Sequence, residues 1–246
     1  MRLDKFLTET AALTRSEGKK RIKEGRVLVD GVIAKKPEQQ IDEALSEIFL
    51  DGKKLVYEQY EYYMLHKPAG VVSATEDRKE RTVLDLLDFV KKKELFPVGR
   101  LDKDTEGLLL ITNDGELAHR LLSPKKHVDK LYFARLAKEI TEQDIAAFAK
   151  GLKVDAELTA KPARLRLLTP EEEALFGSEG FCAAVIIQEG KFHQVKRMFQ
   201  AVDNEVLYLK RMAMGSLYLD ADLKAGDYRR LTEEEVEGLK QYDISE

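Results

Sequence analysis

The sequence predicts an α+β fold, in which a small N-terminal module of two helices and a hairpin precedes a larger domain on a mixed, largely antiparallel sheet. Three observations predict this class. Strand-like runs alternate with helical patterns, but not in the regular order of βαβ units. Asp-Gly pairs separate short β-rich runs, which is typical of tight antiparallel hairpins. Apolar residues form 43% of the 246 residues, enough for a core in one large and one small domain.

Two short helices are expected at the start of the chain. The second helix begins with the capping-box pattern "TRSE" (14–17) and ends before Gly25, a residue that commonly closes helices. The first helix presents one apolar face because four residues recur at helical spacing: Leu3, Phe6, Leu7 and Ala11.

Two hairpins are expected next. The run "RVLVDGVIA" (26–34) places Asp30-Gly31 between β-rich segments, and "IFLDGKKLVY" (48–57) does the same with Asp51-Gly52. A polar joint near residues 56–61 then separates this module from a segment of different character. We therefore expect two domains, at residues 1–58 and 59–246.

The larger domain mixes strands and helices. "YYMLHKPAGVVSA" (62–74) predicts a strand, a tight turn and a second strand, and "TVLDLLDFVKKK" (82–93) predicts an amphipathic helix. The apolar side of that helix is expected to contain Val83, Leu86, Leu87 and Val90. Further strands are expected near residues 107–112, 131–136, 163–168 and 182–190, and further helices before Pro124, at 141–150 and at 193–202.

Charge is unevenly distributed along the chain. Residues 1–36 carry ten Lys and Arg against five acidic residues, so this segment has a charge of +5 within a chain of −4. The apolar runs are too short to span a bilayer, and the N-terminus lacks the apolar region of a secretory signal. A single Cys182 forms no internal disulfide, so we expect a cytoplasmic protein without membrane contact.

The segment "GRLDKDTEGLLL" (99–110) holds three alternating carboxylates, Asp102, Asp104 and Glu106. Their spacing matches the start of a calcium-binding EF-hand loop, but Asn113 stands where that loop needs a glutamate. The four histidines are scattered, and no glycine-rich nucleotide-binding motif is present. We expect no metal and no nucleotide cofactor. Alternation along an extended loop sends all three carboxylates to one side, and we interpret Asp104 and Glu106 as parts of a solvated turn. The pattern alone leaves open whether one of the carboxylates does chemistry, and it does not choose Asp102.

Five segments in order carry a resemblance to a known family. "GRLDKDTEGLLLITNDGELAHRLLSP" (99–124), "YYMLHKPAGVVSA" (62–74), "KLYFARL" (130–136) and "EGKFHQVKRMF" (189–199) resemble the motifs of pseudouridine synthases of the ribosomal small-subunit (RsuA-like) type. The N-terminal "RLDKFL…TRSEGKKRIKEGRVLVDGV" resembles the S4-type RNA-binding module of that group. The resemblance covers nearly the whole chain, so it implies an S4-type domain at 1–58 and a catalytic domain at 59–246.

The resemblance implies roles for four residues. Asp102 corresponds to the catalytic aspartate, and Arg100 to the residue that fills the place of the flipped uridine. Tyr132 is expected to pack against the flipped base, and Lys196 to pair with the aspartate. Many relatives have arginine at the last position; lysine keeps the charge but loses the bidentate fork.

The implied activity is isomerisation of one uridine in 16S ribosomal RNA, without a cofactor. The expected partner is 16S rRNA or a small-subunit assembly intermediate, bound by a monomer. Sister enzymes that act on 23S RNA share the architecture, and a ribosome-assembly protein with no catalytic activity is a third interpretation. A base-releasing glycosidase would be a further alternative, distinguished by free uracil.

The basic N-terminal helices are expected to contact phosphates, which position RNA without reading its sequence. His66 and Lys67 are expected to be turn residues beside Pro68, with Lys67 a candidate for a further phosphate contact. His193 is a candidate for a structural or RNA-backbone contact. The expected RNA-binding surface consists of Arg15, Lys19, Lys20, Arg21 and Arg26.

Overall fold

The computed structural model describes residues 1–11, 13–88, 94–123, 126–177 and 179–242. The described chain divides into two compact units, Met1–Gln59 and Tyr60–Glu246. Among the described residues, no helix has the length and apolar character needed to cross a membrane.

The N-terminal unit begins with the two predicted helices, α1 (Leu3–Thr10) and α2 (Arg15–Lys23). The predicted capping box opens α2: the Thr14 side chain accepts from the backbone of Glu17, whose carboxylate accepts from the backbone of Thr14. Both helices bury apolar residues in one small core, which consists of Leu3, Phe6, Leu7, Ile22, Val27, Val29, Ala34, Ile41 and Ile48.

Both predicted hairpins of this unit are confirmed. They form a four-stranded sheet in the order β2-β1-β3-β4. The turn residues Asp30 and Gly31 have φ of 51° and 79°, and Asp51 and Gly52 have 52° and 78°. Two consecutive positive φ angles make the type of turn whose twist matches antiparallel strands, which is why Asp-Gly occurs here twice. The strands are β1 (Val27–Val29), β2 (Val32–Ile33), β3 (Ile48–Leu50) and β4 (Lys53–Leu55).

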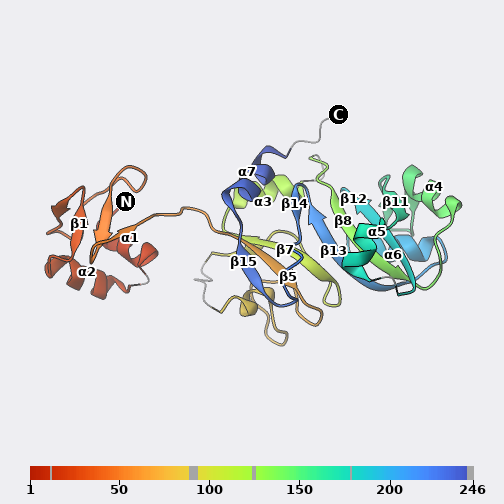
Figure 1. Ribbon diagram of the computed structural model, residues 1–246, viewed down its shortest axis with the longest axis horizontal. Helices are drawn as coiled ribbons and strands as arrows, with labels where there is room; N and C mark the ends of the chain where they lie inside the picture. Colours follow the sequence, from red (N-terminus) through yellow and green to blue (C-terminus); the bar gives the residue numbers. More distant parts are fainter. Residues whose placement is uncertain (12, 89–93, 124–125, 178, 243–246) are drawn as a thin grey trace. The chain divides into compact units, whose positions relative to one another are not determined.

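The second unit is built on one large mixed sheet, with the strand order β11-β12-β8-β13-β7-β5-β15 (Figure 1). Every neighbouring pair in this order is antiparallel except β13 and β7, so the predicted fold class is confirmed. The strands are β5 (Tyr62–Lys67), β7 (Glu106–Thr112), β8 (Lys130–Leu136), β11 (Arg164–Leu167), β12 (Phe181–Ile187), β13 (Val206–Met214) and β15 (Tyr228–Arg230).

Short strands complete this unit. β6 (Phe96–Pro97) pairs with β7, and β14 (Leu217–Tyr218) pairs with β13. A separate ribbon consists of β9 (Leu152–Lys153) and β10 (Thr159–Ala160).

The parallel pair β7–β13 requires a glycine. Gly107 has φ +104°, and a Cβ atom on it would lie 2.2 Å from the carbonyl oxygen of Arg211. No side chain fits this space without moving one strand away from the other. Gly107 therefore allows β7 and β13 to approach closely. This close contact comes directly after the segment that contains Asp102.

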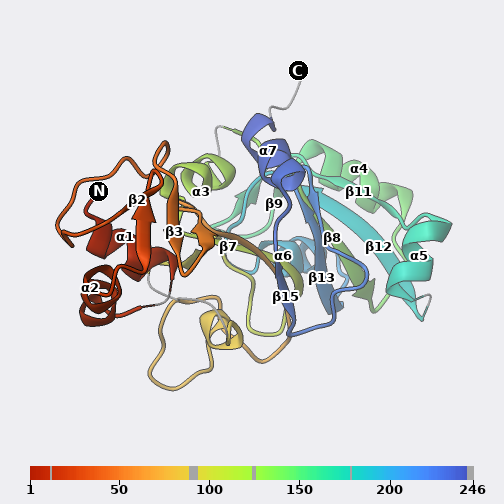
Figure 2. The same ribbon diagram turned by 60° about the vertical axis from the view of Figure 1, so that its left-hand side comes forward.

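Helices cover both faces of the sheet in this unit. On one face, α4 (Glu142–Lys150) and α6 (Gln194–Ala201) bury Phe148, Met198 and Phe199 against the strands. On the other face, α3 (Gly115–Leu122) and α7 (Glu233–Gln241) pack against Leu108 and Leu110 (Figure 2). Alternate residues of β7 enter the two cores, because side chains of a strand point to opposite faces. A further helix, α5 (Pro170–Phe176), starts at the Thr169 cap.

Two predicted elements are wrong. No strand follows the turn after β5, where residues 71–74 make only an isolated bridge from Val72 to Thr82. The predicted helix over 82–93 begins as the short 3₁₀ helix η1 (Val83–Leu86), which ends before Leu87. The apolar residues Val83 and Leu87 of this segment are buried in the core, although the segment forms only a short 3₁₀ helix. Val90 and Pro124 lie outside the described residues.

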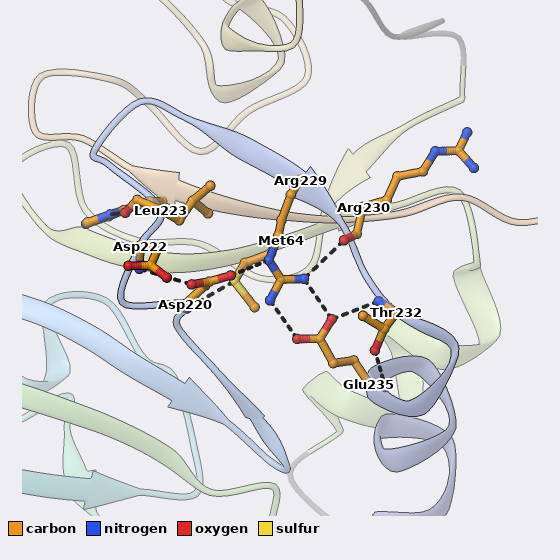
Figure 3. A network of polar contacts seen from close by, with 9 residues as sticks. Met64, Asp220, Asp222, Leu223, Arg229, Arg230, Thr232 and Glu235 are labelled. Carbon is orange, nitrogen blue, oxygen red and sulfur yellow. Dashed lines mark hydrogen bonds and ion pairs between the residues drawn. The ribbon is translucent and has the colours of Figure 1, made fainter.

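An arginine network fastens the edge strand β15 to α7 (Figure 3). The guanidinium of Arg229 donates to Asp220 at 2.7 Å and to both carboxylate oxygens of Glu235 at 2.8 Å. Glu235 also accepts from the backbone of Thr232, the N-cap of α7. Because β15 pairs with β5, the network supports the strand that ends at Lys67.

Glu235→Gln is expected to lower the free energy of unfolding of this unit by about 1 kcal/mol at pH 7, since it removes the charge but keeps an acceptor for the cap. The bond from Arg229 lowers the pKa of Glu235. Its stabilisation is therefore complete above the ordinary carboxyl range near about 4.3 and is lost as pH falls through the lowered pKa. Urea unfolding of both proteins from pH 7 to pH 3 measures the difference.

The matched control is Glu234→Gln, which changes a neighbouring exposed carboxylate of the same helix turn. We expect it to leave stability within about 0.5 kcal/mol of the wild type. An effect of Glu235→Gln that persists unchanged at pH 3 would contradict the assignment.

Candidate active site

One pocket in the second unit brings together residues that are far apart in the sequence. It encloses about 390 Å³, part of it open to solvent. Arg100, Asp102 and Thr105 line it from the loop before β7, and Tyr132 lines it from β8. The rest of the wall consists of Leu209 of β13 and of six residues between 187 and 195: Ile187, Gly190, Lys191, His193, Gln194 and Val195. Three of the four predicted site residues thus share one pocket, and the fourth, Lys196, follows directly after its wall.

The loop that carries Asp102 is held through its backbone. The buried hydroxyl of Ser73 accepts from the Leu101 N–H at 3.0 Å and donates to the Leu101 carbonyl at 2.9 Å. The N–H of Gly70 donates to the Lys103 carbonyl at 2.7 Å. The segment after β5 therefore supports the loop that carries Asp102, although it forms no strand.

Lys67 lies beneath the same loop and is fully buried. Its ammonium donates to the carbonyls of Pro68, Lys103 and Thr105 at 3.0, 3.3 and 2.8 Å. Burial lowers the pKa of Lys67 to about 8, although the nearby carboxylates favour its charged form. The suggested phosphate contact is therefore wrong: Lys67 binds the backbone of the loop and is not exposed to solvent.

Asp102 lies between two basic side chains. Its Oδ2 is 3.3 Å from Nζ of Lys196, and its Oδ1 is 3.7 Å from Nε2 of His193. The side chains of Asp102 and Lys196 are only 25% and 20% exposed, so solvent screens their attraction less than at an open surface. The arrangement places the carboxylate of Asp102 beside an ammonium at the pocket wall.

The three alternating carboxylates have different surroundings. Asp104 shares Lys196 with Asp102: its Oδ1 accepts from Nζ at 2.6 Å, which lowers the pKa of Asp104. Its side chain is 74% exposed, as a turn residue is expected to be. Glu106 differs, because it begins β7 and accepts from the hydroxyl of Tyr208 at 2.7 Å. The expectation that Glu106 belongs to a solvated turn is therefore wrong.

Tyr132 and Arg100 differ in exposure. Tyr132 is 6% exposed, lies opposite Arg211 and Val185 on the neighbouring strands, and faces the pocket and the apolar core. Arg100 also lines the pocket, but it is an exposed residue of the loop. Tyr132 is therefore a buried part of the pocket wall, whereas Arg100 lies where the pocket opens to solvent.

Sequence reasoning missed the residues that position the site. The hydrogen bonds of Ser73 to Leu101 and of Lys67 to Thr105 join residues that are 28 and 38 positions apart in the sequence. Only the quoted turn "HKPAG" indicated that this segment mattered, and it did not show that the lysine turns inward. His193 was expected to be structural or to contact RNA, whereas it lies beside Asp102.

The predicted RNA-binding residues lie on α2 and at its exit in the N-terminal unit. Arg15, Lys19 and Lys20 are exposed. Arg21 is 34% exposed and lies 3.7 Å from Glu24. Arg26 is held by both carboxylate oxygens of Asp51, so its charge is the most strongly neutralised of the five.

Two family models match the chain. The model described as RNA pseudouridylate synthase matches residues 61–201, and the S4 domain matches residues 1–44. Together with the mixed sheet and the pocket, these matches define the class: the chain belongs to the RNA pseudouridine synthases, which are isomerases, and carries an N-terminal S4 domain.

Relatives match over nearly the whole chain. The uncharacterized RNA pseudouridine synthase YtzG of Bacillus subtilis (strain 168) is 46% identical over 98% of this chain and 99% of its own. Ribosomal small subunit pseudouridine synthase A of Escherichia coli (strain K12) is 40% identical over 96% and 98%. A crystal structure of pseudouridylate synthase covers 97% of this chain and 99% of its own, with a TM-score of 0.66 and 38% identity.

Lys67→Met is expected to lower the rate of pseudouridine formation at least tenfold. Loss of the ammonium removes the donation to the carbonyl of Thr105 and leaves the carbonyl of Lys103 with the N–H of Gly70 alone. A loop displaced by about 1 Å can reduce a rate roughly 100-fold. Single-turnover rates on RNA substrate measure the effect.

The control is Lys130→Met. Lys130 is 5% exposed and its pKa is likewise lowered to about 8 by burial, but its ammonium donates to Val128 and not to the loop. We expect a comparable loss of thermal stability with a smaller loss of rate. Equal losses of rate in the two variants would show that Lys67 acts only through general stability.

Proposed function

We propose that the protein converts a specific uridine of 16S ribosomal RNA to pseudouridine, with Asp102 as the catalytic carboxylate. The observation that carries this proposal is the position of Asp102 in a pocket beside Tyr132, 3.3 Å from the ammonium of Lys196. The relatives named ribosomal small subunit pseudouridine synthase A, such as the 40% identical Escherichia coli protein, support the choice of 16S RNA.

The reaction moves one bond of the nucleoside. The N1–C1′ bond breaks, the uracil turns within the pocket, and C5 joins C1′; the C5 proton is lost and N1 gains a proton. Atoms and charge balance without a metal or redox group. Asp102 acts on the sugar, either by attack on C1′ as in glycoside hydrolysis or by removal of a sugar proton.

The neighbours of Asp102 have supporting roles in this proposal. Lys196 offsets part of the cost of desolvating the carboxylate when substrate enters the pocket. Tyr132 offers an aromatic face to the uracil while the base is detached. Arg100, exposed at the pocket, enters the stack that the uridine leaves and offsets part of the unstacking cost of a few kcal/mol.

The N-terminal S4 domain, which we place at residues 1–58, supplies RNA affinity through phosphate contacts of Arg15, Lys19, Lys20, Arg21 and Arg26. Residues 59–246 form the catalytic domain. We propose that the protein acts as a monomer in the cytoplasm, on 16S rRNA or a small-subunit assembly intermediate.

Asp102→Ala is expected to abolish pseudouridine formation while the fold persists, because the residue lies on a partly exposed loop. Carbodiimide-based primer extension on 16S and 23S RNA measures this in cells lacking the protein, complemented with wild type or variant. One site lost from 16S RNA and restored only by the wild type is the expected result.

Three other outcomes would redirect the proposal. A site lost from 23S RNA would keep the chemistry and change the substrate. No lost site in either RNA would favour an assembly protein without activity. Restoration by Asp102→Ala would refute the assignment of the carboxylate.

Lys20→Glu combined with Arg21→Glu is expected to weaken RNA binding and flatten its dependence on salt. Loss of two phosphate contacts reduces the slope of log affinity against log salt by about 1.5. Filter binding from 50 to 300 mM salt measures the slope. Lys53→Glu with Lys54→Glu makes the same charge change on the exposed strand β4. A slope reduced equally by both pairs would exclude a specific surface on α2.

A further inference from the structure

An exposed aromatic pair lies at the rim of the pocket. The ring of Phe192 stacks on the ring of His193, with centroids 3.8 Å apart and an interplanar angle of 18°. Phe192 is 73% exposed, whereas most phenylalanines of a folded chain are buried. His193 lines the pocket, and its Nε2 lies 3.7 Å from Oδ1 of Asp102, so the stack adjoins the proposed catalytic carboxylate.

The backbone holds this pair in place. His193 has φ 49° and ψ 31°, the left-handed conformation that few side chains adopt. The buried side chain of Gln194 accepts from the N–H of Lys191 and donates to Glu189, and Arg197 donates to the carbonyl of Phe192. A strained conformation that the surrounding contacts maintain is typical of functional sites.

The surroundings of Phe192 are polar and basic rather than apolar. Three cations lie within five positions of it, and each is paired with a carboxylate: Lys191 with Glu189, Lys196 with Asp102 and Asp104, and Arg197 with Asp155. A protein partner would require a contiguous apolar patch around the ring. A single exposed ring among polar side chains instead suits a nucleobase, which stacks on an aromatic face without a surrounding apolar patch.

We propose that the Phe192–His193 stack is a platform for the nucleobase adjacent to the target uridine. The proposal rests on the proposed function, since it needs a single strand of RNA with one base in the pocket. Proteins read unpaired RNA by stacking splayed bases on aromatic side chains, and such stacking tolerates any base. The platform keeps the neighbour unstacked from the uridine, which holds the flipped state open.

This role differs from that of Tyr132. Tyr132 is 6% exposed within the pocket wall, where it meets the target base. Phe192 is exposed outside the pocket, where only a base that remains on the strand can reach it. The two aromatic residues therefore contact two successive nucleotides.

The test uses the full-length protein and a 12-nucleotide RNA of cytidines that holds one uridine with 2-aminopurine beside it. Stacking quenches 2-aminopurine fluorescence. We expect quenching by the wild type, and its loss with roughly tenfold weaker binding for Phe192→Ala. Phe192→Tyr keeps an aromatic face and is expected to restore both signals.

Phe181→Ala is the matched control, because Phe181 is 46% exposed on β12 and does not line the pocket. It is expected to behave as the wild type. Quenching by Phe192→Ala equal to that of the wild type, an equal loss in Phe181→Ala, or no quenching by the wild type would each overturn the proposal.

The fluorescence signal requires no turnover, so it separates the platform from the proposed reaction. Wild-type quenching without pseudouridine in the ribosomal RNA map would keep the platform and refute the activity. Pseudouridine formation with quenching independent of Phe192 would keep the activity and refute the platform.

Discussion

A lysine ammonium buried away from water needs hydrogen-bond acceptors, and for Lys67 these are carbonyls of the loop that carries Asp102. The loop can offer them because its residues belong to no helix or strand, which would otherwise use the same carbonyls. Ser73 holds the loop at Leu101, and the N–H of Gly70 reaches Lys103. An irregular segment thus gains the fixed geometry that chemistry requires.

Lysine at position 196 has a physical consequence for the charge of the site. Its ammonium is a point charge that two carboxylates share, at 2.6 Å from Asp104 and 3.3 Å from Asp102. An arginine could contact one carboxylate with both arms of its fork, whereas lysine has no such preference. Asp104 therefore holds Lys196 while leaving Oδ2 of Asp102 with a looser partner. The Asp102 carboxylate therefore lies beside the ammonium of Lys196 without a short hydrogen bond to it. Such a carboxylate keeps its oxygens available, as the proposed action on the sugar requires.

Turns and helix caps could be predicted from adjacent residues, whereas strand pairing between distant segments could not. The two Asp-Gly turns and the Thr14 capping box follow from a few adjacent residues, and they were predicted correctly. The strand β13 joins β8 and β7 near the middle of the sheet, yet no assignment was made beyond residue 202. Its parallel register on β7 depends on Gly107 and Arg211, about 100 residues apart, and no local pattern encodes such a pairing.

Contacts between distant segments were also the part of the candidate site that the sequence did not predict. The family resemblance grouped Asp102, Tyr132 and Lys196, and the structure brings Asp102 and Tyr132 to one pocket with Lys196 beside Asp102. Sequence alternation, however, suggested that Glu106 shares a side with Asp102, and the entry into β7 instead directs it to Tyr208. Lys67 was interpreted as a turn residue, because its sequence neighbours give no sign of the carbonyls to which it donates, those of Pro68, Lys103 and Thr105.

Positive charge is concentrated in one segment of the N-terminal unit. Residues 1–36 carry +5, residues 37–59 carry −4, and the second unit, residues 60–246, has a net charge of −5. A unit with that charge repels a polyanion at long range, so its cations must act locally, at Arg100 and around residues 191–197. An aromatic platform is useful in such a place, since stacking adds affinity without more positive charge near Asp102. Additional cations there would bind phosphate, but they would also compete with Lys196 for the carboxylate on which the proposed reaction depends.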